Sequence, residues 1–227
     1  MKDKTTQSHV SWQLMSLLST FAVAVAVGVY ILYPSKSIPI LQPGDLNPAL
    51  VDSQYWSREQ HTIAPFNLIN HLGDSIQLED VLGDVIIVDF FFTRCATICP
   101  IMTSNLTKVR DELDLEMGWR ILSHSVTPEA DSASVLNAYA KRMDAEHENW
   151  WFLTGEKKEI YRLARRSYFA CYDEARGGDG GMQDFVHTEN VVLVDQKGRL
   201  RGFYDGTSEL SMNQLVEDCQ WLLQEKK

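Results

Sequence analysis

The apolar run "VIIVDFFF" at residues 85–92 constrains the fold more than any other segment. Apart from Asp89, every residue in it is β-branched or aromatic. Such a run is typical of a central strand that is buried on both faces of a sheet. A sheet with two apolar faces needs a covering layer on each side. We therefore expect a sheet packed between other elements.

Strand-like and helix-like patterns alternate through the rest of the chain. Apolar residues at helical spacing follow Pro100, which suits the first turn of a helix because its missing N–H leaves no hydrogen bond unmade. Residues 131–143 are predicted to form a helix behind an aspartate cap. The other expected elements are hairpins turning at Gly73–Asp74 and Lys197–Gly198, strands at 119–126 and 150–155, and helices at 156–169 and 209–224. This order predicts an α/β fold with a mixed sheet flanked by helices.

The amino-terminal part of the chain is predicted to be a membrane anchor. Residues 12–33 carry no charged side chain and, as a helix, are long enough to cross a hydrocarbon core of about 30 Å. Lys2 and Lys4 precede the run, so residues 1–11 are expected to stay in the cytoplasm. A cleaved signal peptide is the alternative.

Residues 34–60 contain four of the seven prolines and lack a sustained period, which predicts a linker. The globular domain is then expected over residues 61–227. The absence of an Arg-rich transit peptide favours a bacterial inner membrane, with the domain facing the periplasm or exterior. The formal net charge of −10 disfavours a nucleic-acid partner, because binding one needs a basic patch.

Two cysteines follow the predicted central strand in "FFFTRCATICPIM". Cys95 is expected on the loop that leaves the strand, and Cys99 in the first turn of the next helix. The N–H groups and the positive dipole at a helix start stabilise a thiolate, and Arg94 adds a positive charge. Two thiolates at this spacing can close a disulfide or hold a soft metal ion. A static disulfide or two packed thiols is the structural alternative.

A metal site needs a third ligand, and His187 is the strongest candidate among the six histidines. It follows a glycine-rich loop and is expected to begin a strand. The other histidines of the predicted domain are expected to have structural or solvent-facing roles. We expect His124 in the core, His147 in a charged loop, and His61 and His71 exposed to solvent.

The ordered motifs "FFFTRCATICPIMTSNL", "LSHSVTPEADSASVLNAYA", "WWFLTG" and "FVHTENVVLVDQKGRLRGFYDG" resemble the Sco/SenC family of membrane-anchored copper proteins. The resemblance covers nearly the whole predicted domain. The family has a cysteine pair with three residues between and a proline after it, together with a distant histidine. Cys95, Cys99 and His187 occupy those positions. Two positions depart from the family pattern, because Thr97 and Thr127 stand where aspartate is often found.

The resemblance implies a thioredoxin-like fold and a metallochaperone, rather than an enzyme, that delivers copper to the binuclear copper centre of cytochrome c oxidase. Its metal ligands would be Cys95, Cys99 and His187. Two sulfurs and one imidazole suit Cu(I), and Cu(II) would need further oxygen ligands. The implied partners are the copper-binding subunit of the oxidase, a copper donor protein and, through the amino-terminal helix, the membrane.

The same pair supports an alternative function, a membrane-anchored thiol–disulfide oxidoreductase acting on exported proteins. Cys95 would attack as the more exposed thiol, and Cys99 would resolve the mixed disulfide. A peroxidase-like thiol enzyme is a third and weaker hypothesis. Cys171 and Cys219 are expected to be a loop thiol and a helix-packing thiol, with a disulfide between them as the alternative.

Overall fold

The computed structural model divides the chain into two compact units, Met1–Ser37 and Ile38–Lys227. The first contains helix α1 (Thr5–Leu32). Among the residues whose structure is described, no helix is both long enough and apolar enough to cross a membrane, so the transmembrane anchor predicted at 12–33 is not supported. The structure describes residues 5–32, 37–48, 50–51, 55–56, 60–114, 117–171, 186 and 188–225.

The second unit is built on a seven-stranded mixed sheet with the order β2-β1-β5-β4-β3-β6-β7. The three central strands β5, β4 and β3 are parallel, whereas β1, β6 and the outer strands pair antiparallel to their neighbours. The mixed sheet predicted from the sequence is therefore confirmed. The strands are β1 (Asn67–Asn70), β2 (Ser75–Gln77), β3 (Val85–Phe91), β4 (Trp119–Ser125), β5 (Trp150–Thr154), β6 (Asn190–Val194) and β7 (Leu200–Asp205).

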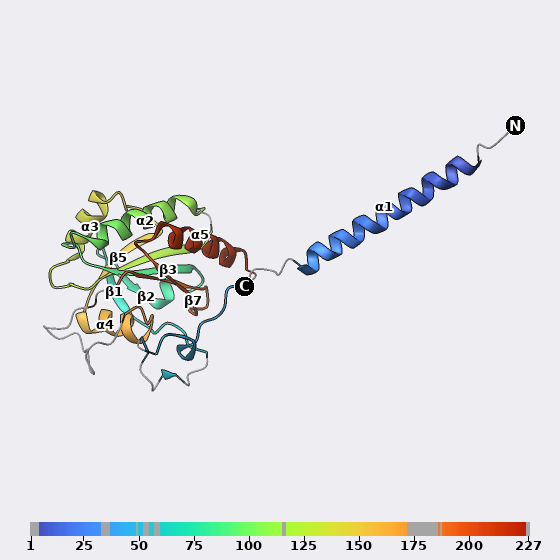
Figure 1. The fold of residues 1–227 in the computed structure, drawn as a ribbon. Helices are drawn as coiled ribbons and strands as arrows, with labels where there is room; N and C mark the ends of the chain where they lie inside the picture. The colour runs from blue at the N-terminus through green and yellow to red at the C-terminus, as the bar shows by residue number, and fades with distance from the viewer. Residues whose placement is uncertain are drawn as a thin grey trace. The chain divides into compact units, whose positions relative to one another are not determined.

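Helices cover both faces of the sheet. Three helices, α2, α3 and α5, lie on one face, and α4 lies on the other (Figure 1). Helix α5 keeps the bounds predicted from the sequence, and α2 begins two residues before Pro100. The four helices are α2 (Ile98–Glu112), α3 (Ala133–Arg142), α4 (Lys157–Arg166) and α5 (Glu209–Gln224), and short 3-10 turns lie at Pro43–Asp45 and Leu78–Asp80.

Strand β3 divides the core into two clusters. Every residue of β3 is buried. Val85, Ile87 and Phe91 pack among side chains of α2, α3 and α5, whereas Ile86 and Val88 face α4. Successive side chains of a strand point to opposite faces, so an unbroken apolar run fills both clusters at once. The prediction from "VIIVDFFF" is confirmed.

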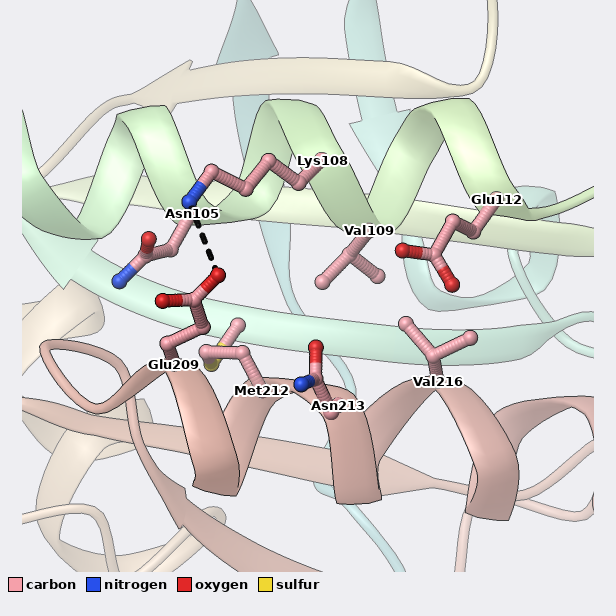
Figure 2. Close-up of a pocket in the computed structure, with 8 residues that line it drawn as sticks. All are labelled: Asn105, Lys108, Val109, Glu112, Glu209, Met212, Asn213 and Val216. Carbon is pink, nitrogen blue, oxygen red and sulfur yellow. Dashed lines mark ion pairs between the residues drawn. The ribbon is translucent and has the colours of Figure 1, made fainter.

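Helices α2 and α5 pack side by side over the sheet and enclose a small pocket between them (Figure 2). Val109, Met212 and Val216 supply its apolar lining. Lys108 and Glu209 form an ion pair of 3.6 Å across its rim, and both side chains are exposed. This pocket contains none of the site residues predicted from the sequence.

The predicted linker differs from the structure over its described part, because the second unit begins at Ile38. Ile38 is buried, and the Leu41 N–H donates to the Leu200 carbonyl at 2.8 Å, beside the sheet edge formed by β7. The buried Arg201 donates to the carbonyl oxygens of Ile38 and Pro39. Residues 38–41 therefore pack on the domain instead of forming a free tether. The sequence pattern missed this contact because it depends on β7, about 160 residues away.

Candidate metal centre

The cysteine pair lies where β3 passes into α2. Cys95 is on the connecting loop and is half-buried, whereas Cys99 is the second residue of α2 and is only 3% exposed. The backbone N–H of Cys99 donates to the Cys95 sulfur at 3.4 Å. Both cysteines are thiols in this structure. The helix start thus brings the two residues together, as the spacing predicts.

The hydrogen bonds around Cys95 favour its thiolate. Partial burial raises the pKa of Cys95, but the hydrogen bonds from Cys99 and Thr97 outweigh it and lower the pKa to about 7. The Thr97 hydroxyl lies 3.8 Å from the Cys95 sulfur. Backbone and hydroxyl donors stabilise a thiolate in the way that they stabilise other anions. Near neutral pH, a large fraction of Cys95 is therefore ionised.

Cys99 has the opposite environment. Burial above all, together with the neighbouring Cys95 and Asp89, raises its pKa to about 12 against the opposing effect of a hydrogen bond with the Phe92 backbone. The Thr103 hydroxyl, one turn along α2, donates to the Cys99 carbonyl at 2.9 Å and lies 2.9 Å from the Tyr139 hydroxyl. Cys99 is thus a buried, protonated thiol next to a thiol that ionises easily.

A pocket opens beside the buried cysteine. Cys99 lines it together with Val186 and Thr188, and its other lining residues are apolar ones of β3, α2 and the end of β4. His187 itself lies outside the described residues, as does the whole glycine-rich loop before it. Strand β6 begins at Asn190, three residues later than the sequence predicted. Both chain neighbours of the predicted ligand therefore line the same pocket as Cys99.

The thiols fit a soft metal ion, but the described residues do not complete a site. Thiolate sulfur selects Cu(I) over hard cations such as Mg²⁺. Among the described residues, no three His, Cys, Asp or Glu side chains are grouped so that they could hold a metal ion.

Comparison with known proteins identifies the family. The model of the SCO1/SenC family matches residues 56–224, which is most of the chain. The chain belongs to the SCO1/SenC family. It is 32% identical over 162 residues to the SCO1 protein homolog of Bacillus subtilis, covering 70% of this chain and 82% of that protein. It is 27% identical to the human mitochondrial SCO1 homolog over 145 residues, which are 62% of this chain and 46% of the human protein.

Solved Sco structures share the fold. BsSco, described as a member of the Sco family of cytochrome c oxidase assembly proteins with a disulfide switch, is 31% identical with a TM-score of 0.61, over 73% of this chain and 95% of that structure. A SCO1/SenC family lipoprotein of Bacillus anthracis is 27% identical with a TM-score of 0.60, over 71% and 95%. Arabidopsis thaliana ScoI with copper bound is 24% identical with a TM-score of 0.56, over 70% and 99%. The thioredoxin-like Sco fold implied by the sequence motifs is confirmed.

Two histidines that the sequence placed in solvent are buried in this Sco domain. His61 is 8% exposed, and its Nε2 lies 2.8 Å from the Ser167 carbonyl. His71 is 7% exposed, and its Nδ1 accepts from the Phe152 N–H at 3.3 Å. The prediction was wrong for His71 because β1 pairs with β5, which places the hairpin turn against Phe152, and for His61 because its ring packs on Phe169. Burial lowers the pKa of His71.

The other two histidines of the described domain behave as predicted. His124 is fully buried in β4, where burial lowers its pKa to about 4 and its ring stacks on Phe90. His147 is partly exposed and stacks on Trp119. Neither of them lines the pocket of Cys99.

The remaining cysteines lie on opposite faces of the sheet. Cys219 is buried in the cluster under α5, and Cys171 is buried in the cluster on the α4 side. Because the sheet separates them, no disulfide joins them, and the alternative pairing is not found. Cys219 is the helix-packing thiol that the sequence predicted.

The sequence analysis did not place two buried carboxyl groups near the cysteines. Asp89, in the middle of β3, is 2% exposed and accepts a hydrogen bond from the Ser123 hydroxyl. Burial raises the pKa of Asp89 to about 7. Asp131 was predicted to cap α3, but the residue at the N-cap is Ser132, and the Asp131 carboxylate points toward the cysteine loop, where Thr93 donates to it. Asp89 had a sequence signal, since it alone interrupts the apolar run.

Proposed function

We propose that this chain binds copper through Cys95, Cys99 and His187 and delivers it to the binuclear copper centre of cytochrome c oxidase during assembly. One observation carries the proposal. The residues on both sides of His187 line the same pocket as Cys99, whose N–H donates to the sulfur of Cys95.

The chemistry of these donors supports copper as the cargo. Two thiolates and one imidazole form a soft ligand set that suits Cu(I), while Cu(II) would need further oxygen ligands. Thiols bind a metal ion as thiolates, so binding releases protons. Cys95 is already partly ionised near pH 7, and the metal would have to displace the proton of Cys99. Sco proteins solved with copper bound share the fold of this chain, which supports the same cargo.

The proposed partners follow from the family. BsSco is described as belonging to the cytochrome c oxidase assembly proteins, which supports the copper-binding subunit of the oxidase as the acceptor. A copper donor protein is required before delivery. A membrane location stays a prediction, and the lipoprotein from Bacillus anthracis supports membrane association of the domain.

Copper binding can be tested by titrating the reduced full chain with Cu(I) against a competing chelator. Tight binding of one equivalent is expected, with a large loss of affinity in His187→Ala and in Cys95→Ser/Cys99→Ser. His147→Ala is the matched control, since His147 stacks on Trp119 away from the pocket. Weak binding that does not depend on His187 would contradict copper delivery.

The thiol–disulfide oxidoreductase remains the second candidate because the two thiols differ in the way that exchange requires. Cys95 is accessible and ionises readily, whereas Cys99 is buried and protonated. The Cys95 thiolate would attack a disulfide of a target and release one target thiol. Cys99 would then lose its proton and attack the Cys95 sulfur, which releases the second thiol and leaves a Cys95–Cys99 disulfide. Two electrons and two protons pass to the target.

Dependence on His187 separates the two functions. Reduction of an exported target by the pair does not require an imidazole, while copper binding does. Full reductase activity in His187→Ala, together with weak copper binding by the wild type, would favour the oxidoreductase. BsSco is described as having a disulfide switch, which is compatible with either function.

A further inference from the structure

Asp131 occupies an unusual position for a carboxylate. It lies between β4 and α3 and is fully buried. Its backbone N–H donates to the Thr127 carbonyl at 3.0 Å, which closes a turn after β4. A buried carboxylate is costly unless hydrogen bonds compensate for its lost hydration. The partners of this group therefore indicate what it does.

Four donors converge on the Asp131 carboxylate. On one side, the Thr93 N–H and hydroxyl donate at 3.2 and 2.5 Å. On the other, the hydroxyls of Ser125 and Thr127 donate at 2.6 and 2.9 Å. Thr93 belongs to the loop that carries Cys95, whereas Ser125 and Thr127 end and follow β4. One carboxylate thus connects the cysteine loop to the neighbouring strand.

A carboxylate suits this arrangement. Its two oxygens accept all four hydrogen bonds. An ionised carboxylate has no proton of its own to donate, so it needs no acceptor among the four groups. An alanine at this position would leave all four donors without their acceptor, and an unpaired buried donor costs more than the loss of one bond. Thr127 fits the same pattern, because its hydroxyl is a donor at a position where the family resemblance leads one to expect an aspartate.

The contact with Thr93 lies at the point where the loop leaves the sheet. At the carboxyl ends of β3 and β4, the Val126 N–H donates to the Phe91 carbonyl at 2.8 Å. Beyond this bond, the Cys95 N–H donates to the Phe92 carbonyl at 3.2 Å. Thr93 is between these two bonds and two residues before Cys95. Its hydrogen bonds to Asp131 therefore fix the direction in which the loop presents Cys95 to Cys99.

We infer that Asp131 is a positioning residue for the cysteine pair, holding the Cys95 loop on the end of β4 through Thr93. This inference deepens the proposed function and rests on the cysteine pair being the functional site. Asp131 touches neither thiol in this role. It acts through the loop, by limiting the geometries in which the two sulfurs can approach a metal ion or each other.

Two substitutions separate positioning from stability. Thr93→Val removes one hydroxyl that donates to Asp131 from the loop, and Ser125→Ala removes one that donates from the strand. Ser125 also accepts from the Thr127 N–H at 3.2 Å, so its loss should destabilise the fold at least as much. The full-length proteins are compared by thermal unfolding and by the equilibrium constant of the Cys95–Cys99 couple with glutathione.

We expect both variants to unfold more easily than the wild type. Thr93→Val should change the equilibrium constant with glutathione about tenfold or more, whereas Ser125→Ala should leave it within about twofold of the wild type. Asp131→Ala, where it folds, removes all four hydrogen bonds and should change it further than Thr93→Val. Equal changes in the two matched variants, or no change in Thr93→Val, would overturn the inference.

The copper function can fail without affecting this test. Cu(I) affinity is measured in the same variants, and Thr93→Val alone is expected to weaken it. Weak copper binding by the wild type would contradict the proposed function, while the glutathione equilibrium would still report on Asp131.

Discussion

The two ends of the central parallel strands β3 and β4 use polar residues differently. At the carboxyl ends, where Phe91 pairs with Ser125, buried hydrogen bonds hold the loop that carries Cys95. At the amino ends, where Val85 pairs with Trp119, polar groups pair mainly with one another. The same two strands thus support a chemical site at one end and a structural contact at the other.

At the amino ends of β3 and β4, the side chains contact one another closely. Arg120 forms an ion pair of 3.1 Å with Asp84, and its guanidinium lies 4.0 Å from the ring centroid of Trp151. The Trp119 indole N–H donates to the Asp114 carbonyl at 2.8 Å. Each of these groups has a partner within the fold.

The difference follows from the connections. In parallel sheets, ligands bind at the carboxyl ends of the strands, where loops lead into the first turns of helices and present unpaired N–H groups. The Cys99 N–H is one such group, and its acceptor is the sulfur of Cys95. Chemistry is therefore expected to respond to changes at this end and stability to changes at the other.

The largest expected effect is the contrast in reactivity between the two thiols at the carboxyl end. With pKa values of about 7 and about 12, their thiolate fractions at pH 7 should differ by several orders of magnitude. Alkylation of the reduced chain by iodoacetamide, followed by mass spectrometry, should modify Cys95 with a midpoint near pH 7 and leave Cys99 unmodified.

Thr97→Val sharpens this prediction. It removes the hydroxyl near the Cys95 sulfur, so the pKa of Cys95 should rise and the alkylation midpoint should move to higher pH. A midpoint near 9 in the wild type, the ordinary value for a thiol, would show that the hydrogen bonds do not stabilise the thiolate.

The next effect concerns Asp89, which lies between the two ends of β3. Burial raises its pKa from 3.8 to about 7, so the folded state holds a proton that the unfolded state has lost. Stability due to this group is therefore complete below about pH 4 and falls as the pH rises toward 7. Each pH unit in that window costs about 1.4 kcal/mol.

Asp89→Asn should remove this dependence. Guanidinium unfolding at pH 5 and pH 8 should show a loss for the wild type that exceeds the loss for the variant by roughly 3 kcal/mol. The same pH dependence in both proteins would mean that Asp89 is not protonated in the folded state at pH 5.

The smallest effect of a substitution is expected at the amino ends of β3 and β4. Arg120→Ala removes the ion pair with Asp84 and the contact with Trp151, and both partners are partly exposed. A loss of about 1 kcal/mol in the free energy of unfolding is expected. The glutathione equilibrium of the cysteine pair should stay within about twofold of the wild type. A larger shift at the cysteines would break the contrast between the two ends of the sheet.

Local sequence patterns were sufficient to predict the helices and strands of the domain and the position of the cysteine pair. The run at 85–92 has the two-faced burial that its composition predicts, and Cys99 lies in the first turn of α2. These features depend on residues close together in the chain. The mixed sheet agrees with the order of the elements, since parallel neighbours such as β3 and β4 need a crossover connection and hairpins give antiparallel neighbours.

Contacts between distant segments could not be predicted in the same way. An aspartate before a helix usually caps it, but the Asp131 carboxylate binds Thr93, which is 38 residues away. His71 lies in a turn, a position typical of exposed residues, and is buried because that turn folds over β5. Periodicity carries no information about which loops meet.

The central claim is that copper is held by two sulfurs and one imidazole nitrogen, and X-ray absorption of the Cu(I)-loaded full chain tests it most directly. The account predicts two sulfur ligands and one nitrogen ligand, with the nitrogen lost in His187→Ala and kept in His147→Ala. A copper site with sulfur ligands only, unchanged by His187→Ala, would contradict it.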